Sequence, residues 1–145
     1  MICKTIIDND HDEMVIIYAH ERTQLVEDIE NFVNGDNSLL VGYCENNIYK
    51  LEPDDIHCFS VEDNKVYAFT DTQHLWIKKR LYNIENTVGR DFIKINQSCL
   101  ANVKNIERFE VTFAGALMVV FKNGHKDYVS RRQLKFVKER IGFKL

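Results

Sequence analysis

The feature that most constrains the fold of this 145-residue chain is a long series of short apolar segments separated by polar turns. The segments are rich in β-branched and aromatic residues, and clusters of Asn, Asp, Gly or Pro lie between them. Such segments predict β-strands joined by tight turns. We expect strands at residues 39–44, 48–51, 56–61, 65–70, 74–77, 92–95, 99–101, 106–113, 117–121 and 125–129.

Two of these turns carry informative sequences. Asn123-Gly124 lies between two predicted strands, and this dipeptide is typical of a type I′ turn, in which both central residues have positive φ. Residues 62–64 form the polar tip of another predicted hairpin. The chain is therefore expected to be mostly β, built largely from hairpins, with helices at its periphery.

Apolar residues recur at helical spacing in three segments, at residues 21–34, 79–88 and 130–141. In the first, the apolar stripe consists of Leu25, Ile29, Phe32 and Val33. The last begins at Ser130 and has Gln133 three residues later, which is the pattern of a capping box. A glycine that can end the helix follows each segment: Gly35, Gly89 and Gly142.

The N-terminal segment predicts two further strands, at residues 2–7 and 14–18, joined by a polar turn. With the first helix they would form a strand-strand-helix extension at residues 1–37, followed by the main domain at residues 38–145. Two roles remain open for the extension. It is either a dimerisation or packing element, or a cap over an edge of the main sheet.

Composition and motifs exclude several classes of protein. A hydrophobic fraction of 45% favours a folded core. No apolar run approaches the ~18 residues that cross a bilayer, and no signal peptide is evident, so we expect a cytoplasmic protein. The four cysteines form no CxxC pair, which argues against a zinc site. Glycine-rich phosphate loops and hydrolase motifs are absent, so we expect no enzyme, no cofactor and no small-molecule substrate.

Charge is distributed very unevenly along the chain. Residues 1–75 contain 4 Lys/Arg and 16 Asp/Glu, whereas residues 76–145 contain 15 Lys/Arg and 6 Asp/Glu. Such a polarity indicates a basic surface that binds a polyanion, although pairing between the two oppositely charged parts is the alternative. The basic residues cluster around predicted strand ends and turns: Lys78, Lys79, Arg80, Arg90, Lys94, Lys104, Arg108, Lys122, Lys126, Arg131 and Arg132.

Three polar groups are candidates for contacts with nucleic acid. Arg131 and Arg132 occupy the first positions of the last predicted helix, where the helix dipole disfavours each cation by about 0.3–1 kcal/mol. A pair of arginines in such a place suggests a function, although two merely exposed arginines are the alternative. The other groups are the polar gap Asn96-Gln97-Ser98 and the hairpin tip that ends at Lys65.

The segment from Leu39 to about Gly142 resembles the LytTR DNA-binding domain family. The most specific stretch is Phe92-Ile93-Lys94-Ile95-Asn96-Gln97-Ser98-Cys99-Leu100-Ala101-Asn102, followed by Ile106. A second signature is Val119-Val120-Phe121-Lys122-Asn123-Gly124, followed by Val129-Ser130-Arg131-Arg132. The resemblance implies an elongated, largely antiparallel β-fold, which binds double-stranded DNA by placing loops in successive major grooves and regulates transcription.

The resemblance also implies roles for individual residues. Lys65, Gln97 and Arg132 fall in the three loops that read bases, and Lys94 and Arg131 at contacts with the DNA backbone. Asn96 and Ser98 flank Gln97 in the second loop. A homodimer, at least on DNA, is implied. Because 38 residues cannot hold a receiver domain, the chain resembles the stand-alone members, often controlled by a membrane protein that holds the regulator inactive.

Two alternatives compete with a DNA-binding regulator. The first is a protein-interaction module, an anti-activator that keeps the fold without binding DNA, and the acidic N-terminal half favours it. The second is a metal or redox sensor that uses His57, Cys58 or Cys99. Adjacent residues on a strand point to opposite faces, so His57 and Cys58 cannot easily share a metal ion.

Overall fold

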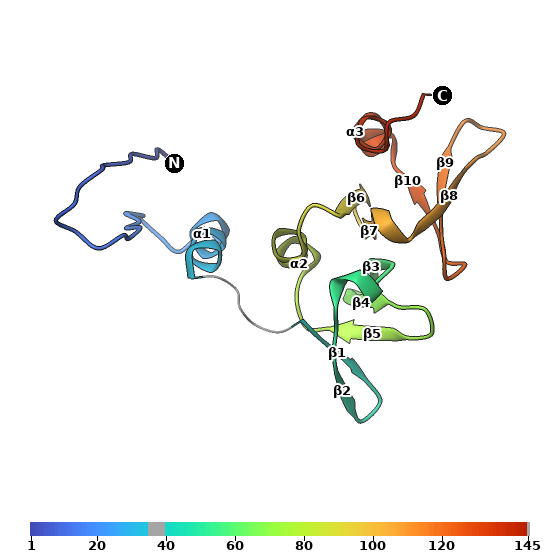
Figure 1. Cartoon of the computed structure of the whole chain (residues 1–145), viewed down its shortest axis with the longest axis horizontal. Coiled ribbons are helices and arrows are strands. Elements are labelled where there is room, and N and C mark those ends of the chain that lie inside the picture. The colour runs from blue at the N-terminus through green and yellow to red at the C-terminus, as the bar shows by residue number, and fades with distance from the viewer. Residues whose placement is uncertain (35–39, 145) are drawn as a thin grey trace. The chain divides into compact units, whose positions relative to one another are not determined.

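The computed structural model describes residues 1–34 and 40–144 (Figure 1). The chain divides into two units, Met1–Asp36 and Asn37–Leu145. Three sequence predictions fall within residues 35–39 and so lie outside the described residues: the glycine after the first helix, the start of the first strand at residue 39, and the domain boundary between residues 37 and 38.

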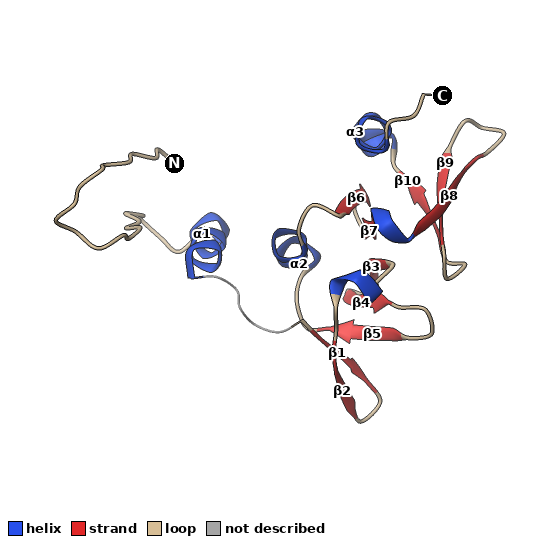
Figure 2. Ribbon diagram, viewed as in Figure 1, coloured by secondary structure: helices blue, strands red, loops and turns tan. Residues whose placement is uncertain are grey.

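Strands form most of the regular structure in the larger unit, as the alternating apolar pattern predicts (Figure 2). One sheet has seven strands in the order β2-β1-β5-β4-β3-β7-β6, and every neighbouring pair is antiparallel. Its strands are β1 (Val41–Cys44), β2 (Asn47–Lys50), β3 (Cys58–Glu62), β4 (Lys65–Phe69), β5 (His74–Ile77), β6 (Phe92–Asn96) and β7 (Cys99–Asn102).

A second, three-stranded antiparallel sheet has the order β10-β9-β8. Its strands are β8 (Ile106–Val111), β9 (Leu117–Phe121) and β10 (Lys126–Val129). The helices of this unit are α2 (Leu81–Val88) and α3 (Arg131–Ile141), and two 3-10 turns lie at Pro53–Asp55 and Val103–Asn105. The prediction of a mostly β fold with peripheral helices is therefore confirmed.

The seven-stranded sheet carries a hydrophobic core on each of its faces. In β4, Val66 and Ala68 point toward the core that contains Ile84 of α2, whereas Phe69 belongs to the core that contains Val137 of α3. This alternation follows from the two-residue repeat of a strand. Phe59, Phe69 and Phe121 are fully buried, and burial of each ring stabilises the fold by about 1.5–3 kcal/mol.

The smaller unit differs from its prediction. Helix α1 spans Gln24–Asn34, but the strands predicted at residues 2–7 and 14–18 are wrong, since residues 1–23 contain no strand. Ile2 is 95% exposed and Ile7 is 90% exposed. A single hairpin gains too little apolar burial to be stable alone, and β-branched residues do not supply the missing core. The predicted stripe of α1 is largely exposed as well: Leu25, Phe32 and Val33.

Of the two informative turns, it is the β3–β4 turn that has the type I′ pattern of φ values, although the sequence analysis predicted this turn type only for Asn123-Gly124. Asp63 and Asn64, which join β3 to β4, have φ values of 50° and 63°, so this two-residue hairpin has the backbone signs of a type I′ turn. In the β9–β10 turn, positive φ falls on Gly124 alone, and Gly124 N–H donates to the Phe121 carbonyl. The type I′ prediction for Asn123-Gly124 is therefore wrong, and the turn is a longer loop with a left-handed glycine.

No helix in the described residues is long and apolar enough to cross a membrane.

Candidate nucleic-acid interface

Three of the predicted DNA-contact elements lie at one end of the larger unit. The β3–β4 turn is tied to the β6–β7 turn because Val61 N–H donates to the Ser98 carbonyl over 2.8 Å. The β6–β7 turn is tied in turn to the start of α3, where Ser130 N–H donates to the Ile95 carbonyl over 2.9 Å. Segments more than 60 residues apart in sequence therefore form one continuous edge, built from main-chain hydrogen bonds.

Asn96 occupies the centre of this edge and is only 1% exposed. Its Nδ2 donates to Asp127 Oδ1 (3.0 Å) and to the Tyr128 carbonyl (2.8 Å), and its Oδ1 accepts the Ser98 N–H (2.8 Å). Both amide protons are therefore used within the protein. Bidentate pairing with adenine needs one of those protons, so this side chain is placed to hold the β6–β7 turn against β10.

The other predicted contact residues are accessible. Gln97 and Ser98 lie exposed at the tip of the β6–β7 turn, Lys65 is exposed at the first position of β4, and Arg131 and Arg132 are exposed on α3. Lys94 is half-buried on β6, the edge strand of the large sheet. The structure thus brings the predicted residues to one edge, with all but Asn96 open to solvent to some degree.

The start of α3 confirms part of the predicted capping box. Ser130 Oγ accepts the Gln133 N–H over 3.3 Å, as the pattern predicts. The reciprocal bond to the Ser130 N–H is replaced, since that group docks on the Ile95 carbonyl. Arg131 and Arg132 follow at once, and the first turn contains no acidic residue. The helix therefore begins with two exposed cations and with main-chain N–H groups, both of which attract anions.

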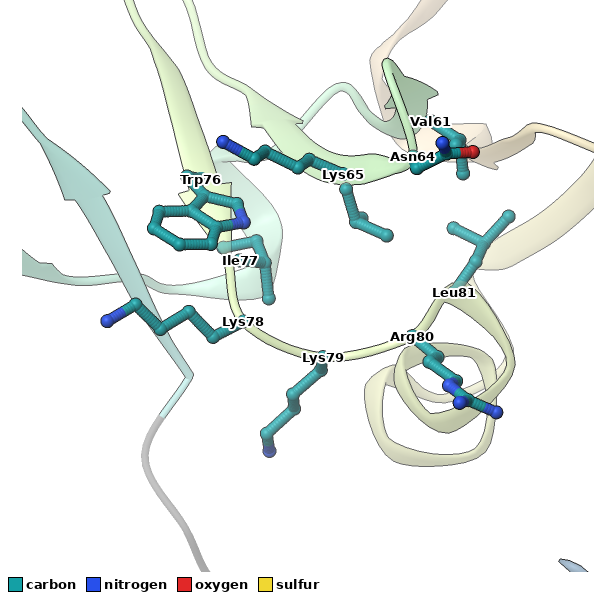
Figure 3. Close-up of a pocket in the computed structure, with 10 residues that line it drawn as sticks. Val61, Asn64, Lys65, Trp76, Ile77, Lys78, Lys79, Arg80 and Leu81 are labelled. Atoms are coloured by element: carbon teal, nitrogen blue, oxygen red, sulfur yellow. The ribbon is translucent and has the colours of Figure 1, made fainter.

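Lys65 belongs to a small cluster of cations and aromatic rings. Its Nζ lies 4.8 Å from the centroid of the Trp76 ring, and Lys78 Nζ lies 5.0 Å from the same ring (Figure 3). Lys78 Nζ also lies 4.2 Å from the Tyr43 ring. A cation–π contact orients an ammonium group without neutralising it, so both lysines keep their charge at the surface.

The structure sorts the basic residues of the larger unit into two sets. The first set is paired with carboxylates. Lys104 lies 3.2 Å from Asp91 and 3.6 Å from Asp54, and Lys126 lies 3.4 Å from Glu110. Arg108 pairs with Glu107 and Glu110. The hydrogen bond that Lys104 donates to Asp91 and the charge of Asp54 raise the pKa of Lys104, and hydrogen bonding by Arg108 lowers the pKa of Glu110.

The second set has no carboxylate partner in the described part of the chain. It includes Lys65, Lys78, Arg80, Lys94, Arg131 and Arg132, most of which lie at the edge described above, and elsewhere in the unit Arg90, Lys122, Lys135, Lys138 and Arg140. The sequence analysis listed basic residues of both sets together, because charge alone does not show which carboxylates fold next to which cations. A row of cations left without intramolecular partners is the electrostatic pattern expected for a surface that binds a polyanion.

The residues of the sensor alternative lie in different surroundings. Cys58 and Cys99 are fully buried in the core, and His57 is buried with its Nε2 2.6 Å from Asp71 Oδ1. Among the residues that the structure describes, no group of three or more His, Cys, Asp or Glu side chains is arranged to hold a metal ion.

Comparisons with known proteins agree with the geometry. The family model of the LytTr DNA-binding domain matches residues 46–142. An uncharacterized HTH-type transcriptional regulator from Staphylococcus aureus strain NCTC 8325 is 34% identical over 135 residues, which cover 92% of each chain. A regulator of the same description from strain MSSA476 is 35% identical over 127 residues, which cover 86% of each chain.

Among solved structures, the LytTr DNA-binding domain of a Bacillus cereus protein superimposes with a TM-score of 0.68 at 18% sequence identity. The superposition covers 74% of this chain and 99% of that domain. At this level of identity the match demonstrates a shared fold, including the antiparallel sheets described above.

Proposed function

Since the chain belongs to the LytTR DNA-binding domain family, we propose that it is a sequence-specific transcriptional regulator whose loops enter successive major grooves of double-stranded DNA. Membership of this family indicates a DNA-binding regulator rather than an enzyme. The relatives are named as HTH-type regulators, but in the described residues strands separate α1, α2 and α3 from one another. Loops and one helix start, rather than a helix-turn-helix, are the candidates for reading DNA.

In this proposal Lys65, Gln97 and Arg132 read bases. Arginine pairs bidentately with guanine in the major groove, and glutamine can do the same with adenine. Lys94, Ser98 and Arg131 contact the sugar-phosphate backbone and set the orientation of the protein. Asn96 does not read a base and acts as a positioning residue, because its amide is used within the protein. The observation that carries the proposal is the single edge of exposed polar groups, whose cations have no carboxylate partner among the residues that the structure describes.

The hydrogen bonds within the edge favour recognition by a pre-formed surface. Ser98 and Ser130 are fixed to neighbouring strands through main-chain groups, and Asn96 connects the turn to β10. Gln97 and Arg132 are therefore presented with little freedom of the backbone. A surface ordered before binding avoids part of the entropy cost of association.

The proposal includes location and partners. A regulator of transcription acts on DNA in the cytoplasm of a bacterium, and we propose a homodimer on two spaced DNA sites. We also retain a membrane-protein inhibitor as a partner. Large apolar side chains of the smaller unit support a protein partner, because several are exposed within that unit: Ile2, Ile7, Tyr18 and Phe32.

The second candidate function is the protein-interaction module without DNA binding. The same exposed apolar side chains favour it, as does the excess of 16 Asp/Glu over 4 Lys/Arg in residues 1–75. In that case the unpaired cations would bind an acidic protein surface. The two candidates differ in one respect that is easily measured, which is discrimination among DNA sequences.

Selection of bound sequences from a random duplex library, with the full chain at physiological salt, tests the proposal. We expect enrichment of one motif, in two copies spaced by whole helical turns. Arg132→Ala should lose enrichment at defined base positions while it remains folded by circular dichroism. A folded wild-type protein that enriches no motif would contradict the proposal and favour the interaction module.

A further inference from the structure

We propose that the β5–α2 connection, residues 78–80, is a fourth DNA-contact element, which binds the phosphate backbone beside the β3–β4 turn. The inference rests on the proposed function, because it concerns how the same surface holds DNA. It adds a site that the three-loop arrangement does not include and names its ligand as the sugar-phosphate backbone of duplex DNA.

The position of the connection follows from strand register. Strand β5 pairs antiparallel with β4, and its last residue, Ile77, lies opposite Val66. Lys65 precedes Val66 and directly follows the β3–β4 turn. Residues 78–80 therefore leave the sheet at the same edge as the turn that carries Lys65. A backbone that passes the turn also passes the connection.

An open pocket of about 440 Å³ lies between the two elements (Figure 3). Apolar side chains form its floor, and its rim carries Lys65, Lys78, Lys79 and Arg80. No acidic residue is among the described residues that line it. Lys65, Lys78 and Arg80 form no ion pair with a carboxylate elsewhere in the described chain either. These three residues therefore carry positive charge that no carboxylate in the described chain compensates.

Aromatic rings hold two of these cations in place. Trp76 lies between Lys65 and Lys78, with its ring centroid 4.8 Å and 5.0 Å from their ammonium nitrogens (Figure 3). Tyr43 contacts Lys78 as well. Lysine loses much side-chain entropy when it binds a phosphate, and these contacts remove part of that freedom beforehand. Trp76 is thus a positioning residue for two phosphate-binding cations.

The start of α2 repeats the charge pattern of the start of α3. Arg80 is the residue before the helix, makes no side-chain capping bond, and is followed by a first turn without an acidic residue. Polar capping residues are the usual choice at that position, and the helix dipole disfavours a cation there. In α3 the proposed function assigns Arg131 and Arg132, the first two residues of the helix, to DNA. The same unfavourable arrangement in α2, next to the pocket, points to the same ligand.

The directions of the side chains distinguish a polymer from a small anion. In Figure 3 the charged ends of Lys78, Lys79 and Arg80 point outward from the pocket and do not converge on its centre. A small anion needs convergent donors. Successive phosphates of a DNA strand instead match a row of separated cations, and each such contact releases counterions.

The experiment measures binding of the full chain to a duplex that it selects and to a scrambled duplex, over a range of salt concentrations. Lys78→Gln/Arg80→Gln should weaken binding to both duplexes by about tenfold and reduce the slope of log K against log salt by about two. Lys122→Gln is the control, since it removes an exposed cation from the β9–β10 turn, which lies at the opposite end of β10 from the start of α3. We expect it to change neither quantity. Lys78→Arg/Arg80→Lys keeps both charges and should restore the slope.

Each outcome separates this inference from the proposed function. A double variant that is folded by circular dichroism and keeps the wild-type slope would overturn the fourth contact and leave the three loops intact. Selective weakening on the selected duplex alone would also overturn it, because a backbone contact acts on all sequences. A wild-type protein that binds neither duplex would instead contradict the proposed function itself.

Discussion

The small sheet, β8 to β10, and the loop edge, formed by the β3–β4 turn, the β6–β7 turn and the start of α3, belong to the same unit and are both rich in cations. They differ in whether those cations are paired with carboxylates. On β8 and β10, Arg108 and Lys126 share Glu110, and in the 3-10 turn before β8 Lys104 pairs with Asp91 and Asp54. At the loop edge the cations have no carboxylate partner in the described residues. Exposed ion pairs contribute little to stability, so the difference concerns the electric field outside the protein more than the energy of the fold.

The number of basic residues in a region therefore does not show whether that region can bind a polyanion. Pairing largely cancels the field of the small sheet even at short range, whereas the field of the loop edge extends over a Debye length of ~10 Å toward an approaching polyanion. Neighbouring residues of one turn show the same division. Asn96 is satisfied within the protein, while Gln97, the next residue, is exposed.

The largest effect is expected when a group satisfied inside the protein is removed. Asn96→Ala leaves the Tyr128 carbonyl and the Ser98 N–H without their partners, so we expect a loss of about 2–4 kcal/mol in the free energy of unfolding. Urea denaturation measures this loss. Gln97→Ala, at the exposed neighbour, should change stability by less than about 0.5 kcal/mol. Equal stability of the two variants would show that Asn96 is not a positioning residue.

Removal of an unpaired cation should affect binding and spare the fold. Arg132→Ala is expected to cost about 1–3 kcal/mol of specific binding, with little change on a scrambled duplex, if Arg132 reads a base. Fluorescence anisotropy on both duplexes measures the difference. Arg108→Ala is the paired counterpart. If Arg108→Ala weakens specific binding as much as Arg132→Ala does, the distinction between paired and unpaired cations is contradicted.

A backbone contact at the same edge should behave differently. Lys94→Ala is expected to weaken all duplexes alike and to reduce the salt slope by about one, because a single phosphate contact is lost. Titrations at four or five salt concentrations give the slope. Loss of discrimination between duplexes, without a change in slope, would reassign Lys94 to base reading.

The smallest effect is expected for the paired set. Hydrogen bonding by Arg108 lowers the pKa of Glu110, so the pair stabilises the fold above the unfolded-state pKa of that carboxyl group. This contribution disappears as the pH falls through the lower, folded-state pKa. Arg108→Ala should therefore lose slightly less stability than the wild type on acidification below neutral pH. Thermal unfolding across that range measures it, and a steeper loss in the variant would contradict the assignment.

Local patterns predicted most of the larger unit correctly, because each strand there packs at least one apolar face into a core. His74–Ile77 was predicted to the residue, and α3 ends at Gly142 with a left-handed φ of 84°. The strands predicted at residues 2–7 and 14–18 have similar composition but no core to pack against. Composition alone does not distinguish the two cases, since the difference lies in tertiary contacts.

The edge itself was predicted only in part, for the same reason. The polar run Asn96-Gln97-Ser98 marks a turn, but the partner that fixes Asn96 lies 31 residues away at Asp127. Nothing local to the run separates the buried amide from the exposed one. Likewise, the register that pairs Ile77 with Val66 places residues 78–80, the basic β5–α2 connection, at the loop edge. That register is a property of the assembled sheet.

The β3–β4 turn limits how this surface can evolve. Asp63 and Asn64 both adopt positive φ, which β-branched and bulky residues resist, so most mutations there would cost stability before they altered recognition. Asn, Asp and Gly are nearly the only tolerated occupants. At this turn, new target preferences must therefore arise mainly at Lys65, just outside the constrained pair. The backbone of this turn thus restricts substitution at Asp63 and Asn64, whereas the side chain at position 65 can change and alter recognition.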